Sequence, residues 1–268
     1  MSHYGGYGTR IRFGGRLTAA VRALIIANVA VFLLQLILHF ASPDGAALNT
    51  FTELFALKPA LAIGKLRVWQ FITHSFLHDL ANLLHIGMNM FLLWMFGGDV
   101  ESALGRRRFF KLYFAAALAG GIAMIPWYHT FILGASGAVF GVMAMYARLF
   151  PYRRLLVWGI FPVRARTLVF VLAGLDLLLA IQGSATGTAH LAHVGGFVIG
   201  WFFLPLERAM HKSRQSRQLG QKIRREEDDA KVRRKVDELL AKVGREGLGS
   251  LTRRERDFLS RASKRFRR

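Results

Sequence analysis

Ser136 is the side chain in this sequence best suited to act as a nucleophile. It lies in Gly134-Ala135-Ser136-Gly137, at the start of an apolar segment. A serine in the first turn of a helix has unpaired backbone N–H groups and the positive end of the helix dipole beside it, and such groups can hold an oxyanion. The short motif is weak evidence by itself, because chance produces it readily in a glycine-rich chain and the serine would serve equally as a helix N-cap.

His193 is the side chain best suited to activate this serine. A serine hydroxyl is a poor nucleophile until a base accepts its proton, and imidazole does so near neutral pH. Gly137 and Gly141 share one helical face of the segment that follows the serine. Gly196 and Gly200 lie on the same face of a later segment as His193. Because small residues let helix backbones approach closely, packing of the two glycine faces would bring the serine and the histidine together.

His85 and Asn89 are the third polar feature of the apolar part of the chain. They are four residues apart, so on a helix they point the same way. An imidazole or amide N–H aimed at a tetrahedral intermediate is a common complement to a serine nucleophile. The alternative is a hydrogen bond that joins two helices, worth about 1 kcal/mol.

The segments that carry these residues have the composition of membrane-spanning helices. The chain is 53% hydrophobic, yet its net charge is +21, so the charges must be segregated from the apolar runs. A span needs roughly 20 residues, because a helix rises about 1.5 Å per residue across a core of about 30 Å. Leu17–Phe40 is long enough, and five further apolar segments follow, at about Leu83–Phe96, Phe109–Trp127, Ser136–Phe150, Thr167–Ile181 and Ala192–Leu206, so that six spans are expected.

The stretch from residue 41 to residue 80 interrupts this series. It contains Pro43, Gly45, Pro59 and Gly64 between aromatic and apolar residues, which is typical of a long structured loop with short interfacial helices. Trp69 belongs to the class of side chains that favours the lipid interface.

Positive charge predicts the orientation of the spans. Arginines precede the first span, cluster at 106–108 and 153–154, and fill the tail, whereas connections 128–133 and 182–189 carry no Lys or Arg. Positive loops stay cytoplasmic, so both termini are expected on that side. The second, fourth and sixth spans then run inward from the outer face, which places His85, Ser136 and His193 at one depth. Polar side chains in a membrane are costly unless they face a common protein interior or cavity, so this agreement favours one site.

The motifs together resemble the rhomboid family of intramembrane serine proteases. Gly134-x-Ser136-Gly137 opens the fourth span, and Ala192-His193-x-x-Gly196-x-x-x-Gly200 opens the sixth. The second span carries His85-x-x-x-Asn89 and closes with Gly97-Gly98-x-x-Glu101. The resemblance covers about residues 15 to 206 and implies a six-transmembrane-helix bundle, an all-α membrane fold.

The resemblance implies a role for each matched residue. Ser136 becomes the nucleophile and His193 the general base and acid. The oxyanion falls to the Ser136 backbone N–H with His85 and Asn89, and Ala135 supports that turn. The family works with a dyad, so Asp176 is expected to be a packing or loop-anchoring residue, and His190 lines the site one turn outward. The family's first loop often carries Trp-Arg, whereas this chain has Trp69-Gln70, so the loop's arginine contacts are in doubt.

Metal binding is the alternative role for the histidines. His78, His85, His190 and His193 could converge, and the last two are three residues apart. However, the chain has no His-Glu-x-x-His and no cysteine, and two of these histidines have a better role in the serine site. The sequence therefore predicts no metal and no other cofactor.

The two ends of the chain differ in character from the apolar core at 17–206. Residues 1–16 are basic and read as a retained cytoplasmic segment rather than a cleaved signal. Residues 207–268 carry 21 Lys and Arg against 10 Asp and Glu. Their apolar spacing predicts a soluble helix, a break at 244–249, and a second helix opened by a Thr252/Glu255 capping box. Anionic membrane lipids or solvent explain this charge more simply than nucleic acid.

Three functions fit the chain to different degrees. Hydrolysis of peptide bonds in or near transmembrane segments of other membrane proteins is the leading expectation, in a bacterial inner (cell) membrane. An inactive scaffold of the same family would bind such segments without cutting them, but Ser136 and His193 are both present. A small-solute transporter would need polar residues along a full path, whereas here they share one depth. The oligomeric state and the natural substrate are not predicted.

Overall fold

The computed structural model describes residues 16–126, 131–157, 160–181 and 187–266. The chain divides into two compact units, one up to Leu204 and one from Pro205 to Arg268. The predicted basic N-terminal segment lies almost wholly outside the described residues, as do parts of both connections that carry no Lys or Arg.

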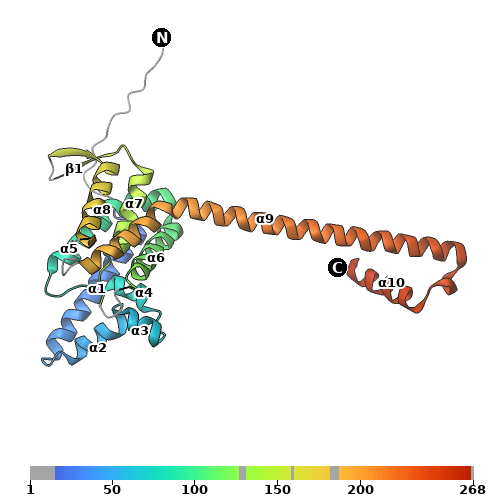
Figure 1. Cartoon of the computed structure of the whole chain (residues 1–268), viewed down its shortest axis with the longest axis horizontal. Helices are drawn as coiled ribbons and strands as arrows, with labels where there is room; N and C mark the ends of the chain where they lie inside the picture. The colour runs from blue at the N-terminus through green and yellow to red at the C-terminus, as the bar shows by residue number, and fades with distance from the viewer. Residues whose placement is uncertain (1–15, 127–130, 158–159, 182–186, 267–268) are drawn as a thin grey trace, which may run out of the picture. The chain divides into compact units, whose positions relative to one another are not determined.

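Six of the described helices in the first unit overlap the six predicted spans (Figure 1). Their bounds are α1 (Ala19–Ala41), α5 (Leu83–Leu104), α6 (Arg106–Ala123), α7 (Ser136–Leu149), α8 (Ala165–Ile181) and the first part of α9 (Gly187–Glu246). Two helices among the described residues, α1 and α5, are long and apolar enough to cross a membrane by length and composition alone. The count of six spans therefore stays a prediction.

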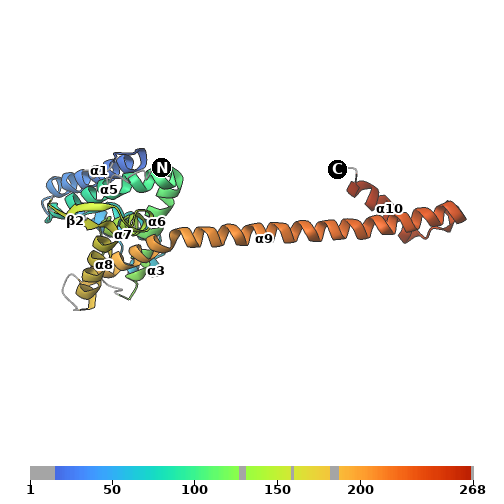
Figure 2. The same cartoon turned by 90° about the horizontal axis from the view of Figure 1, so that it is seen from above.

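Helix α7 lies in the middle of this unit. Figure 2 shows α1 and α5 on one side of it and α8 on the other. Its residues from Gly137 to Ala147 are buried except for Phe140, because nearly every position in this helix is apolar or small. By contrast, α1 leaves a row of large apolar side chains exposed, including Ile26, Leu33 and Ile37, as a lipid-facing surface would.

Helix α1 is anchored at its start by Glu101 from the end of α5. The carboxylate accepts hydrogen bonds from the backbone N–H groups of Ala20 and Val21, at 2.9 and 3.1 Å, and from the Thr18 hydroxyl. A negative charge at a helix N-terminus satisfies unpaired N–H groups and complements the helix dipole. At the same corner, a Cβ on Gly98 would lie only 2.0 Å from the Arg16 carbonyl oxygen, so the chain can pass there only beside a glycine.

The segment between α1 and α5 is a structured loop with short helices, as predicted. These are α2 (Ala46–Phe55), α3 (Pro59–Gly64), α4 (Gln70–Thr73) and the 3-10 turn η1 (His74–Phe76). Gln70 is fully buried: its amide N–H donates to the Glu53 carbonyl at 2.8 Å, and its oxygen accepts from Lys58 N–H at 3.3 Å. Trp69 donates from Nε1 to the Leu54 carbonyl at 2.9 Å. The neutral amide of Gln70 thus holds this loop together at the position where the family often has an arginine.

Two buried histidines make the stability of this loop depend on pH. His74 and His78 are 3% and 1% exposed, and burial lowers the pKa of each from 6.5 to about 4. Between pH 6.5 and about 4 these two histidines are protonated in the unfolded chain but neutral in the folded one. The free energy of unfolding therefore decreases as the pH falls from 6.5 toward 4. Each pH unit in this window costs at most about 1.4 kcal/mol per histidine.

We therefore expect the unfolding temperature of the detergent-solubilised protein to fall between about pH 7 and pH 4.5. Replacing His74 with Gln should flatten this dependence, because the amide does not titrate. The matched control is His39→Gln, at an exposed position at the end of α1, which should leave the slope unchanged. An equally steep pH dependence in His74→Gln and wild type would contradict the assignment.

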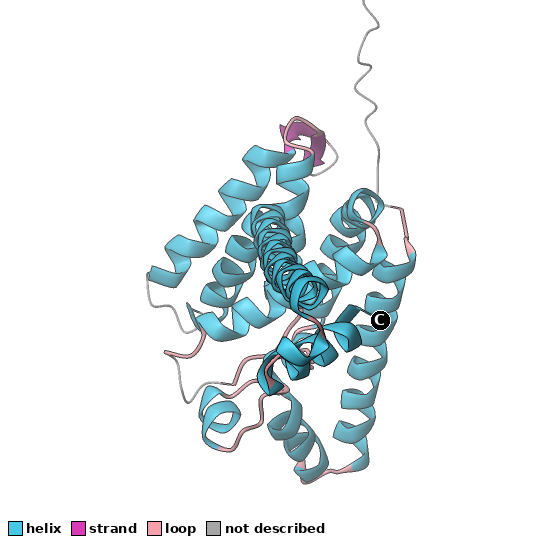
Figure 3. Cartoon of the chain, turned by 90° about the vertical axis from the view of Figure 1, so that its right-hand side faces the viewer, coloured by secondary structure: helices cyan, strands magenta, loops and turns pink. Residues whose placement is uncertain are grey.

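The structure departs from the expected all-helical fold at one short hairpin. The chain is not wholly helical, because β1 (Arg154–Val157) pairs antiparallel with β2 (Phe161–Arg164) between α7 and α8, drawn in magenta in Figure 3. Leu, Val and Phe in this stretch suit a short hairpin, a signal too brief to stand out in an apolar chain. The division of the chain at residue 206 stays a prediction. The two compact units meet at Leu204 and Pro205, and α9 runs without interruption from one unit into the other.

The second unit contains the rest of α9, the turn η2 (Leu248–Ser250) and α10 (Arg253–Phe266). The predicted capping box is confirmed: Thr252 N–H donates to the Glu255 carboxylate at 2.7 Å, and Glu255 N–H donates to the Thr252 hydroxyl at 3.3 Å. Leu239, Leu251 and Ala262 are buried, so α10 folds back on the end of α9 as a small helical hairpin.

Candidate active site

Ser136 is the first residue of α7 and follows a turn that only glycine makes easily. Gly134 has φ of 123°, where other residues are strained, and a Cβ there would lie 2.8 Å from His85 Nε2. The first helical hydrogen bond, from Val139 N–H to the Ala135 carbonyl, is 3.0 Å long. The N–H groups of the first turn before it have no helical acceptor, so they are available to an anion.

The turn before the serine is hydrogen-bonded to the first loop. Ile132 and Leu57 exchange two backbone hydrogen bonds of 2.8 and 2.9 Å, and Gly134 N–H donates to the His74 carbonyl at 2.9 Å. These three bonds fix the backbone that leads into Ser136.

His193, in the second turn of α9, is held in direct contact with Ser136. Its Nε2 lies 2.6 Å from the Ser136 hydroxyl oxygen, and this arrangement would let the imidazole accept the hydroxyl proton. The ring of Phe140 stacks on the imidazole with centroids 4.4 Å apart and planes 3° from parallel. Stacking and hydrogen bonding together fix the orientation of the imidazole.

Close contact of the two glycine faces brings these residues together. A Cβ on Gly196 would lie 1.9 Å from the Gly137 carbonyl oxygen, and a Cβ on Gly200 would lie 2.1 Å from the Gly141 oxygen. Real side chains never come this close to backbone, so α7 and α9 can pack at this distance only with glycine at these positions.

His85 lies beside the turn that precedes Ser136, and Asn89 lies behind His85. The Cβ position of Gly134 is 2.8 Å from His85 Nε2 and 3.7 Å from Ser136 Oγ, so the imidazole and the serine hydroxyl lie around the same turn. The Asn89 amide donates to the His85 carbonyl at 2.9 Å and contacts His78 Nε2 at 3.5 Å. In this structure Asn89 therefore supports the histidine pair rather than contacting the serine.

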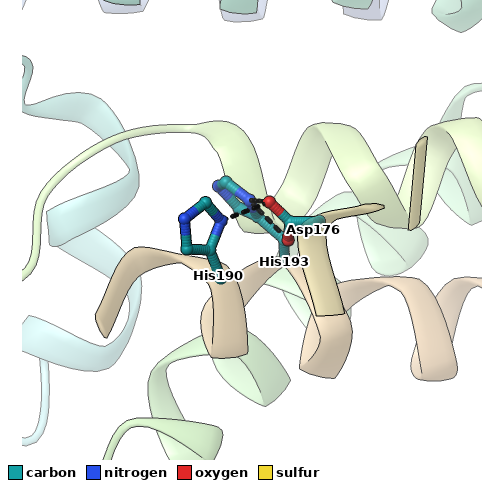
Figure 4. Close-up of side chains that lie close together, drawn as sticks. All are labelled: Asp176, His190 and His193. Atoms are coloured by element: carbon teal, nitrogen blue, oxygen red, sulfur yellow. Dashed lines mark hydrogen bonds and ion pairs between the residues drawn. The ribbon is translucent and has the colours of Figure 1, made fainter. Parts of the chain in front are cut away.

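Asp176 was missed as a site residue by the sequence reasoning. It was expected to be a packing or loop-anchoring residue, but its carboxylate lies against two histidines of α9 (Figure 4). His193 Nδ1 is 3.0 Å from both carboxylate oxygens, and His190 Nδ1 is 2.5 Å from one of them. A lone carboxylate inside an apolar span was the signal, because ionisable residues there are functional candidates by default.

The same three residues form the one group among the described side chains whose donor atoms converge as metal ligands do. The ligand atoms of Asp176, His190 and His193 lie within 4.8 Å of one another. The metal set weighed from sequence was different. His78 and His85 pair with each other instead, with ring centroids 5.2 Å apart.

A cavity of 220 Å³ adjoins the imidazole between α7, α8 and α9. Its walls are almost entirely apolar, and Asp176 and His193 are its polar members. Apolar walls exclude water and so strengthen the electrostatic interaction between these two residues.

The comparison with known protein families decides the family. The rhomboid domain family matches residues 65–209, more than half of the chain, and this stretch holds both Ser136 and His193. The chain belongs to the rhomboid family. Rhomboid proteins are embedded in membranes, in agreement with the apolar helices of this one.

Curated relatives of this rhomboid come from yeast, plants and bacteria. It is 35% identical over 152 residues to rhomboid protein 1, mitochondrial, of Saccharomyces cerevisiae, covering 50% of this chain and 41% of that protein. It is 28% identical over 173 residues to rhomboid protease GluP of Bacillus subtilis, covering 63% and 32%. It is 28% identical over 204 residues to RHOMBOID-like protein 12, mitochondrial, of Arabidopsis thaliana, covering 68% and 57%. This rhomboid thus spans less than two thirds of the length of each.

Proposed function

We propose that this rhomboid is an intramembrane serine endopeptidase that hydrolyses peptide bonds in or near transmembrane segments of other membrane proteins. The observation that carries the proposal is the 2.6 Å contact between Ser136 Oγ and His193 Nε2 at the start of a buried helix. Relatives named as rhomboid proteases, such as GluP of Bacillus subtilis, support the same activity. No cofactor takes part in the proposed chemistry.

The proposed reaction has two halves. As Ser136 Oγ bonds to the scissile carbonyl carbon, its proton moves to His193 Nε2. That proton then passes to the leaving amine as the C–N bond breaks, which leaves an acyl ester on Ser136. A water molecule, deprotonated by His193, hydrolyses the ester and restores both residues.

The oxyanion of both intermediates is proposed to bind at the first turn of α7. The unpaired Ser136 N–H and the positive end of the helix dipole lie where the charge develops. The His85 imidazole borders this position, because it lies 2.8 Å from the Cβ position of Gly134. Asn89 is assigned to the same function through its support of His85, and Ala135 holds the turn between Gly134 and the serine.

The proposed setting is a membrane crossed six times, with the active site near the outer face. The distribution of Lys and Arg supports this setting, with residues 1–16 and the tail from 207 to 268 on the cytoplasmic side. A bacterial inner (cell) membrane is the proposed location. Anionic lipid headgroups are the proposed partners of the basic tail, and transmembrane proteins are the proposed substrates.

Replacement of Ser136 by Ala tests the activity. We expect purified wild type in detergent to react with a fluorophosphonate probe and to cleave a reporter protein with one transmembrane segment, and Ser136→Ala to do neither. The physical reason is that Ser136 Oγ is the described hydroxyl hydrogen-bonded to the imidazole that would remove its proton. Ser250→Ala in the tail is the matched control and should behave as wild type.

Two outcomes would contradict the proposal. Cleavage by Ser136→Ala at the wild-type rate would remove Ser136 from the reaction. Failure of the wild type to label or cleave, together with capture of the intact reporter, would favour the scaffold that binds transmembrane segments without cutting them.

A further inference from the structure

Asp176 is the carboxylate closest to the proposed catalytic base. It comes from α8, in an otherwise apolar stretch between Val169 and Ile181, and only 8% of its surface is exposed. Figure 4 shows its side chain directed at His190 and His193 on α9. A buried charge of this kind is expensive unless hydrogen-bond donors compensate it, so its partners here matter.

The contact between Asp176 and His193 fixes which imidazole nitrogen carries the proton. A carboxylate only accepts hydrogen bonds, and His193 Nδ1 lies 3.0 Å from both of its oxygens, so Nδ1 must be the N–H. The neutral ring then has its lone pair on Nε2, which is the atom that faces Ser136 Oγ at 2.6 Å. This is the tautomer that a general base needs.

The same contact favours the charge that forms during the reaction. When the Ser136 proton reaches Nε2, the Nδ1 proton stays in place and His193 becomes an imidazolium next to the carboxylate. The apolar cavity beside both residues keeps the local dielectric low, which strengthens their attraction. A carboxylate in this position acts on the serine through the histidine.

His190 supplies the second donor to the carboxylate. It lies one turn before His193 on α9, and its Nδ1 is 2.5 Å from Asp176 Oδ1. Its Nε2 is buried without a hydrogen-bond partner among the described residues, so the contact with Asp176 is its polar anchor. The two histidines therefore clamp the carboxylate from the same helix.

We infer that Asp176 and His190 are a positioning pair that holds His193 in the tautomer and orientation required to deprotonate Ser136. The inference rests on the proposed function, because it concerns the same reaction. In this chain Ser136, His193 and Asp176 then form one chain of hydrogen bonds, and His190 holds the Asp176 carboxylate in place.

A divalent cation on Asp176, His190 and His193 would take the Nδ1 lone pairs and leave the proton of His193 on Nε2. Cation binding and proton acceptance from Ser136 therefore exclude each other.

Replacement of Asp176 by Asn tests the inference. The Asn amide can donate to Nδ1, which stabilises the wrong tautomer. We expect kcat for the reporter and the rate of fluorophosphonate labelling both to fall by about 10²- to 10⁴-fold, with KM unchanged. Asp176→Glu should recover part of both rates, because it restores a carboxylate. The control is Asp237→Asn in the exposed part of the tail, which should match wild type.

The loss of kcat at constant KM separates positioning from a general loss of structure, which would also lower the unfolding temperature and the labelled fraction. If Asp176→Asn does not fold, the kcat of His190→Ala is measured instead. It should lower kcat by about 10- to 100-fold, and His190→Gln, whose amide can donate to the same oxygen, should restore it. Wild-type kcat in Asp176→Asn, or in His190→Ala where the first does not fold, overturns the inference.

Two further arms keep the alternatives apart. A wild type that neither labels nor cleaves contradicts the proposed function, whereas an active wild type with an equally active Asp176→Asn contradicts only the positioning pair. EDTA should leave the wild-type rate unchanged. A rate that falls with EDTA and returns with zinc would assign the three side chains to a metal and overturn the inference.

Discussion

Replacing His193 with Ala is expected to reduce peptide-bond hydrolysis by about 10⁴-fold or more, below the limit of a gel-based cleavage assay. The hydroxyl of Ser136 would lose the imidazole that lies 2.6 Å away and accepts its proton. Without that base the serine attacks a carbonyl slowly, and the leaving amine has no proton donor. Labelling by a fluorophosphonate probe should fall in parallel, since it depends on the same activated oxygen.

His211→Ala is the matched control for this experiment. His211 lies on the same helix, is exposed, and is far along the chain from the serine site, so its loss should leave cleavage and labelling unchanged. Circular dichroism and gel filtration of His193→Ala should match wild type. Cleavage by a folded His193→Ala protein within tenfold of the wild-type rate would remove His193 from the role of base.

Replacing Gly196 with Ala is the change expected to damage the structure most. The added Cβ would lie 1.9 Å from the Gly137 carbonyl oxygen, and backbone cannot rotate away as a side chain can. Helices α7 and α9 must separate, which also pulls His193 from Ser136. We expect a loss of about 3 kcal/mol or more, at or above the upper end of the usual range for overpacking, measured by thermal unfolding in detergent. Cleavage should fall with it.

Gly220→Ala provides the comparison, because it makes the same chemical change on the same helix. A Cβ at Gly220 meets nothing within 4 Å, so the substitution should leave the unfolding temperature unchanged or raise it slightly. An unfolding temperature of Gly196→Ala equal to that of wild type would mean that the two helices do not rely on this close contact.

The helices and the central pair of residues could be predicted because strong, repeated signals carry them. Long apolar runs can hardly be anything but helices in a membrane, and each predicted segment is helical. The glycine spacing carries geometric information as well. Residues four apart share a face, so two such faces predict which helices meet and at what height the serine and histidine lie.

The missed features depend on contacts between segments that are distant in the sequence. Asp176 could be recognised as unusual, but the sequence does not reveal which residue on a neighbouring helix its carboxylate meets. The role of Gln70 likewise depends on carbonyl groups of Glu53 and Leu54, and every residue has such groups. The hairpin of β1 and β2 is short, and between its terminal Arg154 and Arg164 its strand residues are apolar like those of the helices around it.

The hydrogen bonds between the first loop and the serine turn have a consequence for the dynamics of the protein. Because Leu57 pairs with Ile132 and the His74 carbonyl accepts from Gly134, the loop and the backbone before Ser136 share their bonding partners. Neither can open without breaking bonds of the other, so they form one cooperative opening unit. Local unfolding of a loop outside the main helices would therefore displace Ser136 and stop the proposed reaction before the helices themselves separate.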